Sequence, residues 1–144
     1  MFSPSRQDAR SIFFETWRKY RAQEALAGIE VLILEAVLQH PEYHELLAHP
    51  EKYGERDFPP EQGETNPFLH LSMHLALAEQ LSIDQPPGVR ACHAALLARL
   101  DDAHAAQHEV MECLAEMIWQ AQRNQTAPDA AIYLACLDKK VGGR

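Results

Sequence analysis

The sequence predicts an all-α protein, a compact bundle of five to seven helices forming a single domain over residues 1–144. Apolar residues recur at three- and four-residue spacing through most of the chain, as they do on the buried face of a helix. Pro, Gly, Asn and Asp stand between these segments, where helices begin and end. No segment alternates apolar and polar residues long enough to favour a strand, and no solenoid-type repeat is present.

The first half of the chain divides into helices at capping residues and prolines. A helix is expected from Ser5, its N-cap, to about Gln23, and a second over 26–39 with Val31, Leu32 and Leu38 among its inward residues. The second helix should end at His40, because a residue that precedes proline is pushed out of helical geometry. A short third helix follows over 41–49. Residues 50–66, rich in Pro, Gly and charge, are then expected to form one long loop.

The second half should hold longer helices. Asn66 is expected to cap a helix that starts at Pro67 and runs to about Leu81. Further helices are expected over 88–100 and 101–124, with Asp101 or Asp102 as the cap between them, although one continuous helix fits the pattern too. A last helix is expected over 128–139. The tail, residues 140–144, should be disordered.

Composition and charge exclude several classes of function. The formal net charge is −8, with 21 acidic and 13 basic residues, which argues against a nucleic-acid-binding protein. The most apolar segments are about half the ~20 residues that a bilayer requires, so no membrane partner is expected. The N-terminus lacks the features of a signal peptide, and a cytoplasmic location is expected.

The three cysteines are not expected to pair or to bind zinc. Cys92, Cys113 and Cys136 lie far apart, and none belongs to a Cys-x-x-Cys motif. Cys92 and Cys113 stand among apolar residues at helical spacing, where buried thiols are common. An odd number of cysteines also fits a reducing compartment.

Histidines four residues apart are the most informative pattern. Residues at this spacing are separated by about 40° around a helix and by roughly 6 Å along it, so both imidazoles can bind one ion. Three pairs have this spacing: His40 and His44, His70 and His74, His104 and His108. The first pair spans a His-Pro boundary, so its two rings need not share a face and it carries the least weight.

The other two pairs predict a metal site. His70 and His74 lie on a helix that is apolar nearly all round, where a buried imidazole is costly unless it has a partner. On the later helix, Glu112 follows His108 by four residues and could complete a set of ligands with His104. If the two helices pack antiparallel, four imidazoles and one carboxylate converge. Such a set suits a divalent transition metal, namely Zn, Fe, Mn or Ni.

An alternative interpretation is a helical module with no catalytic function. The histidines would then be hydrogen-bonded members of ordinary helices, and the acidic surface and the long loop would serve protein interaction or regulation. This interpretation predicts dispersed histidines and an exposed apolar patch, with a protein partner or a homo-oligomer. Whether the chain is an enzyme, and which residues would then be catalytic, stays open.

Segments along the whole chain resemble one known family. The segments are "FFETWRKYRA", "HPEYHELL", "EQGETNPFLHLSMHLALAEQ", "PPGVRA", "DAHAAQHEVMECLAEMIWQAQR" and "PDAAIYLACL". They occur in the same order in domain-of-unknown-function family eighteen forty-one, an uncharacterised bacterial family. The resemblance implies a small bacterial cytosolic protein. It supplies neither an activity nor any ligand residue.

Overall fold

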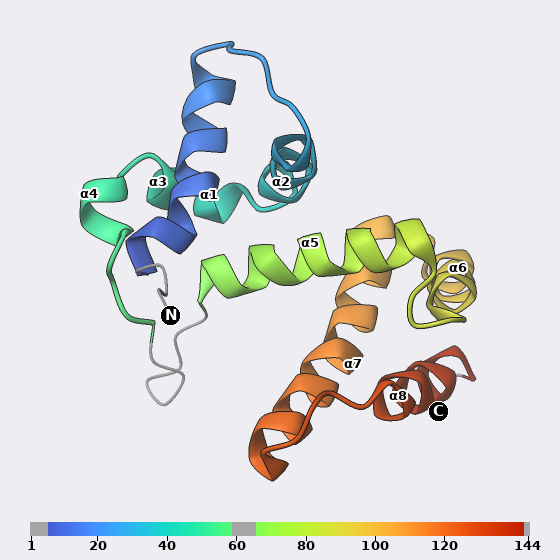
Figure 1. Cartoon of the computed structure of the whole chain (residues 1–144). Coiled ribbons are helices and arrows are strands. Elements are labelled where there is room, and N and C mark those ends of the chain that lie inside the picture. Colours follow the sequence, from blue (N-terminus) through green and yellow to red (C-terminus); the bar gives the residue numbers. More distant parts are fainter. Residues whose placement is uncertain (1–5, 59–65, 143–144) are drawn as a thin grey trace. The chain divides into compact units, whose positions relative to one another are not determined.

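A computed structural model describes residues 6–58 and 66–142 of the chain (Figure 1). The described residues form α-helices and one short 3-10 helix with no strand, which confirms the all-α prediction. The chain divides into two compact units, unit 1 over residues 1–75 and unit 2 over residues 76–144. The single-domain expectation stays a prediction. Each unit is described by itself below.

Unit 1 contains two longer helices followed by three single-turn helices. Its elements are α1 (Arg6–Arg21), α2 (Ile29–Leu38), η1 (Pro41–Tyr43), α3 (His44–Leu47), α4 (Pro50–Tyr53) and the first part of α5 (Pro67–Ile83). The expected N-cap Ser5 lies outside the described residues. The start of the expected loop over 50–66 instead forms α4, because Pro50 takes the first position of a helical turn. Residues 59–65 of that loop also lie outside the described residues.

Aromatic and aliphatic side chains of α1, α2, α3 and α5 form the core of unit 1. Its members are Phe13, Phe14, Trp17, Ile33, Ala36, Val37, Leu47, Phe68 and Leu71. Asn66 caps α5 as predicted, since its Oδ1 accepts hydrogen bonds from the backbone nitrogens of Phe68 and Leu69. This cap sets where α5 begins and therefore which of its residues face the core.

The buried face of α2 differs from the predicted one. Ile33, Ala36 and Val37 are its buried residues, whereas Val31 and Leu38 are 44% and 46% exposed. The prediction was right for Ala36, which was also expected to face inward, and wrong for Val31 and Leu38, because α2 is apolar on nearly every side. A helix of that kind carries no amphipathic signal from which its orientation could be inferred.

Unit 2 contains the end of α5 and three further helices, α6 (Val89–Leu100), α7 (Ala103–Asn124) and α8 (Ala130–Val141). Asp101 adopts a left-handed conformation that ends α6, and Asp102 caps α7 by accepting from the nitrogen of Ala105. The alternative of one continuous helix is thereby excluded. The helix α8 extends to Val141, past the expected start of the disordered tail, and residues 143–144 lie outside the described residues.

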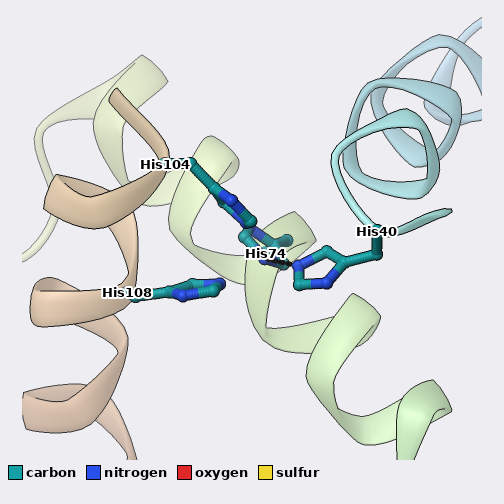
Figure 2. Close-up of side chains that lie close together, drawn as sticks. All are labelled: His40, His74, His104 and His108. Atoms are coloured by element: carbon teal, nitrogen blue, oxygen red, sulfur yellow. Dashed lines mark hydrogen bonds between the residues drawn. The ribbon is translucent and has the colours of Figure 1, made fainter. Parts of the chain in front are cut away.

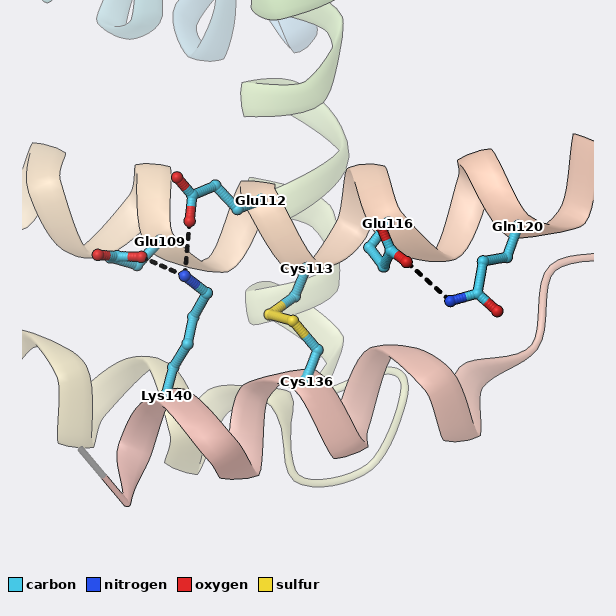
Figure 3. Close-up of a disulfide and its surroundings, with 7 residues drawn as sticks. All are labelled: Glu109, Glu112, Cys113, Glu116, Gln120, Cys136 and Lys140. Atoms are coloured by element: carbon cyan, nitrogen blue, oxygen red, sulfur yellow. Dashed lines mark hydrogen bonds and ion pairs between the residues drawn. A yellow bond between two sulfur atoms is a disulfide. The ribbon is translucent and has the colours of Figure 1, made fainter. Parts of the chain in front are cut away.

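A disulfide between Cys113 and Cys136 joins α7 to α8 (Figure 3). The expectation that Cys113 is a buried thiol was therefore wrong. The two helices form an antiparallel pair, which brings cysteines 23 positions apart in the sequence to a Cα–Cα distance of 5.6 Å. Cys92 remains a thiol. Because disulfides are typical of oxidising compartments, the cytoplasmic location stays a prediction.

Candidate metal centre

His40 stands at the junction between α2 and η1, where the sequence forces a break in the helix. Gln39 closes α2, and Pro41 opens η1. His40 between them has φ −128° and ψ 71°, outside the helical region, as expected for a residue before proline. This backbone carries its side chain into the interior of unit 1, where the residue is only 4% exposed.

Three imidazoles of unit 1 meet at the Nε2 atom of His40. This atom lies 3.0 Å from Nε2 of His74 and 3.1 Å from Nε2 of His70 (Figure 2 shows the first of these contacts). His70 and His74 are one helical turn apart on α5, with ring centroids separated by 4.9 Å. His74 is buried, and His70 is half-buried. The predicted pair on α5 is thus brought together with a histidine from another element.

The proton on His40 can be placed from its other ring nitrogen. Nδ1 lies 2.8 Å from Oε2 of Glu42, and this hydrogen bond lowers the pKa of the Glu42 carboxyl. An ionised carboxylate can only accept, so Nδ1 of His40 is the donor. In the neutral ring, Nε2 then carries a lone pair and no proton.

One lone pair on Nε2 cannot be directed at two nitrogens at once. Hydrogen bonding alone would require His70 and His74 to donate to the same lone pair of His40. A metal ion would instead accept one lone pair from each ring. Ligands at metal–nitrogen distances of about 2.0–2.1 Å are themselves separated by roughly 2.8–3.4 Å in octahedral or tetrahedral sites, close to the separations seen here.

His44, the other member of the first predicted pair, points away from this group. Its Nε2 donates to the carbonyl of Val37 at 2.9 Å. Its ring stacks on Trp17 with a centroid distance of 4.3 Å. The His-Pro boundary therefore separates the two members of the pair, as the sequence indicated, and only His40 joins the α5 histidines.

The predicted residues of unit 2 lie on α7. His104 and His108 project from the same side of this helix, with ring centroids 4.1 Å apart (Figure 2). Both are half-buried. Glu112 is largely exposed, and its Oε2 accepts from Nζ of Lys140 on α8 at 2.6 Å (Figure 3). Glu109 accepts from the same ammonium, which lowers the pKa of the Glu109 carboxyl.

Histidines in the described part of the chain could hold a metal ion: His40 and His74 in unit 1, and His104 and His108 in unit 2. Imidazole is a ligand for Zn, Fe, Ni and Cu alike, so the residue types alone do not select one metal. His40 was given least weight in the sequence, and Glu42 was not considered. The His-Pro step that ends α2 is the local feature that indicates both residues. It takes His40 out of helical geometry, so that its side chain can contact residues outside α2.

No helix among the described residues combines the length and the apolar character that crossing a bilayer would require.

Comparison with curated proteins gave no match, and comparison with solved structures gave none either. A family model described as a domain of unknown function (DUF1841) matches residues 5–139. This match covers nearly the whole chain and agrees with the resemblance seen in its sequence segments. The chain belongs to the DUF1841 family.

Proposed function

We propose that this protein binds a divalent transition metal ion through His40, His70 and His74. The observation that carries the proposal is the approach of two Nε2 atoms, at 3.0 and 3.1 Å, to the single lone pair of His40 Nε2. The hydrogen bond from His40 Nδ1 to Glu42 supports it further. Metal-binding histidines usually donate their second ring nitrogen to a carboxylate or carbonyl, which fixes the tautomer and makes the ligand more basic.

We also propose that His104 and His108 contribute to binding the ion. They have the helical spacing of paired ligands, and their ring centroids lie 4.1 Å apart on α7. Glu112 remains in the proposed set as a ligand or a base, although its ion pair with Lys140 would then have to open. An ion held only by the three imidazoles of unit 1 would keep positions for water, and metal-bound water is the reagent of metal-assisted hydrolysis.

Elemental analysis of untagged protein, purified without chelator, tests this proposal. Near-stoichiometric Zn, Fe, Mn or Ni is expected in the wild type. His40→Ala should lose the metal, because that substitution removes the Nε2 atom that the rings of His70 and His74 approach. The matched control is His49→Ala, since the side chain of His49 is exposed and its Nδ1 pairs with the carboxylate of Glu51.

The double variant His104→Ala/His108→Ala separates the two parts of the proposal. Metal lost in this variant as well as in His40→Ala would support one ion with ligands from both groups. Metal retained would confine the site to unit 1 and overturn the contribution of α7. Wild-type protein that contains no metal and takes up none of the four added ions would overturn the proposal as a whole.

A second candidate function is protein interaction through the exposed side of α2. Val31 and Leu38 are apolar, lie within about 20° of each other around the helix, and are 44% and 46% exposed. Exposed apolar patches of this kind mark interaction surfaces. Light scattering on the wild type and on Val31→Glu/Leu38→Glu tests it: a homo-oligomer that dissociates in the variant would support the candidate, and a monomeric wild type would count against self-association.

A further inference from the structure

Unit 1 also contains a cleft of about 840 Å³ between α1 and the short helices α3 and α4. Its apolar lining includes Phe14, Trp17, Leu47 and Pro50. The volume falls in the range of small-molecule sites, roughly 300–1,000 Å³, which are mostly apolar with a few polar groups. None of the proposed metal ligands lines this cleft.

Two arginines line the cleft, and they differ in their partners. Arg18 is held by carboxylates on both sides, with Glu15 at 2.6 Å and Glu24 at 2.9 Å. Arg21 makes no ion pair within the described residues, and its guanidinium lies 5.8 Å from the centre of the Trp17 ring. Arg21 is therefore the cation that a ligand can reach without breaking an existing ion pair.

Trp17 provides a second uncommitted group. The side chain is 5% exposed and lines the cleft, while its indole Nε1–H is buried without a hydrogen-bond acceptor in the described part of the chain. Buried donors are normally satisfied, because leaving one unpaired is costly. A ligand oxygen that reached this nitrogen, after a small displacement of side chains, would be the missing acceptor.

The charges on the lining select the type of ligand. A carboxylate matches the planar fork of a guanidinium, which can donate two parallel hydrogen bonds to it. Glu15 and Glu51 also line the cleft, so an anion with several charges would be repelled. The apolar lining between α1 and α3 requires an apolar body behind the charged head.

We propose that the cleft formed by α1, α3 and α4 binds a small apolar monocarboxylate, with its carboxylate on Arg21 and its hydrocarbon body against Phe14, Trp17 and Leu47. The proposal does not depend on metal binding. His40→Ala, the variant expected to lose metal, should bind such a ligand as the wild type does.

Fluorescence titration with three probes of equal chain length tests the proposal. The titration uses the variant Trp119→Phe, in which Trp17 is the one tryptophan left of the two in the chain. Decanoate should change the Trp17 emission and saturate. Decanol, which lacks the charge, should bind about tenfold more weakly, and decylamine, whose charge is reversed, more weakly still. Equal affinity for the three probes, or no binding of any of them, would overturn the proposal.

Substitutions of arginine locate the carboxylate. Arg21→Gln should weaken decanoate binding about tenfold and leave decanol unchanged, whereas Arg21→Lys, which keeps the charge and loses the planar fork, should weaken decanoate binding less than Arg21→Gln does. Arg123→Gln is the matched control, because Arg123 lies 5.2 Å from the ring of Trp119 in unit 2 and this geometry resembles that of Arg21 and Trp17.

Ala48→Phe places a ring in the cleft and should weaken decanoate and decanol together. The helical circular dichroism of each variant must match that of the wild type, so that loss of binding is not loss of folding. Decanoate affinity that survives both Arg21→Gln and Ala48→Phe would place the probe elsewhere and overturn the assignment.

Discussion

The imidazole of His40 donates through Nδ1 to Oε2 of Glu42, 2.8 Å away, although the side chain of His40 is 5% exposed and that of Glu42 is 60% exposed. The exposed carboxylate thus orients a buried ring. On α5, the Nε2 atoms of His70 and His74 face the opposite nitrogen of that ring. At the proposed metal site, Glu42 would therefore act through His40 and would not itself be a ligand.

Glu42→Ala should lower metal affinity by about 10-fold to 100-fold, because the carboxylate fixes the tautomer of His40 and raises its basicity. Glu42→Gln should lose less, since its amide oxygen can still accept from Nδ1. Competition titration with a chromophoric chelator measures both. Glu51→Ala is the control, because Glu51 accepts in the same way from the exposed His49. Unchanged affinity in Glu42→Ala would contradict this role.

The histidine pattern shows how much of a site local spacing can predict. His70 and His74, and likewise His104 and His108, are neighbours on one helix, so four-residue spacing is enough to place them together. His40 precedes His70 and His74 by 30 and 34 residues, and its contacts with them depend on how α2 and α5 pack. No local pattern contains that information, and His40 is therefore absent from the ligands predicted from the sequence.

The buried side chain of Arg10 links α1 to the end of α4 and the residues that follow it. Arg10 is 6% exposed, and its Nη1 donates to the carbonyls of Tyr53 and Arg56 at 2.9 and 2.8 Å. Its guanidinium also lies 4.3 Å from the centre of the Phe68 ring. This arrangement combines charge-assisted hydrogen bonds with a cation–π contact.

Arg10→Met should lower the free energy of unfolding of unit 1 by about 2 kcal/mol, because the part-buried carbonyls of Tyr53 and Arg56 lose a charged donor while the apolar volume of the side chain is kept. Urea unfolding followed by Trp17 fluorescence, in the Trp119→Phe background, measures the change. Arg90→Met is the control: Arg90 also donates to two backbone carbonyls, but on the surface of unit 2. An equally small effect of both substitutions would show that Arg10 is not a structural anchor.

The disulfide should stabilise unit 2 measurably. Cys113 and Cys136 close a loop with a sequence separation of 23, for which the chain-entropy model gives about 3 kcal/mol. Cys113→Ser/Cys136→Ser should lower the free energy of unfolding by about that amount, and reductant should do the same to the wild type. Cys92→Ser, which alters the remaining thiol, should have little effect. Three titratable thiols in unreduced, unfolded protein would contradict the pairing.

The helices were predicted better than their packing. The caps Asn66 and Asp102 stand where the sequence put them, because capping depends on a few neighbouring residues. The pairing of Cys113 with Cys136 and the buried side of α2 depend instead on which helices meet. Contacts of that kind follow from the tertiary fold, and the spacing of residues along one helix does not encode them.

His93 on α6 is a half-buried titratable group. Its Nε2 is buried and has no hydrogen-bond partner within the described residues. This burial lowers the pKa of His93 below its ordinary value of 6.5, since the charged imidazolium would lose its hydration. None of the proposed metal ligands lies on α6.

Unit 2 should therefore become less stable as the pH falls below about 6.5. Between that value and the lowered pKa of folded His93, the unfolded chain binds a proton that the folded chain does not, so the stability present above this window is lost through it. Urea unfolding of metal-free protein at about pH 7.5 and about pH 5.5 should show a smaller loss for His93→Gln than for the wild type. His49→Gln, which alters an exposed histidine, should retain the wild-type loss. Identical losses in wild type and His93→Gln would show that His93 titrates alike in the folded and unfolded chains.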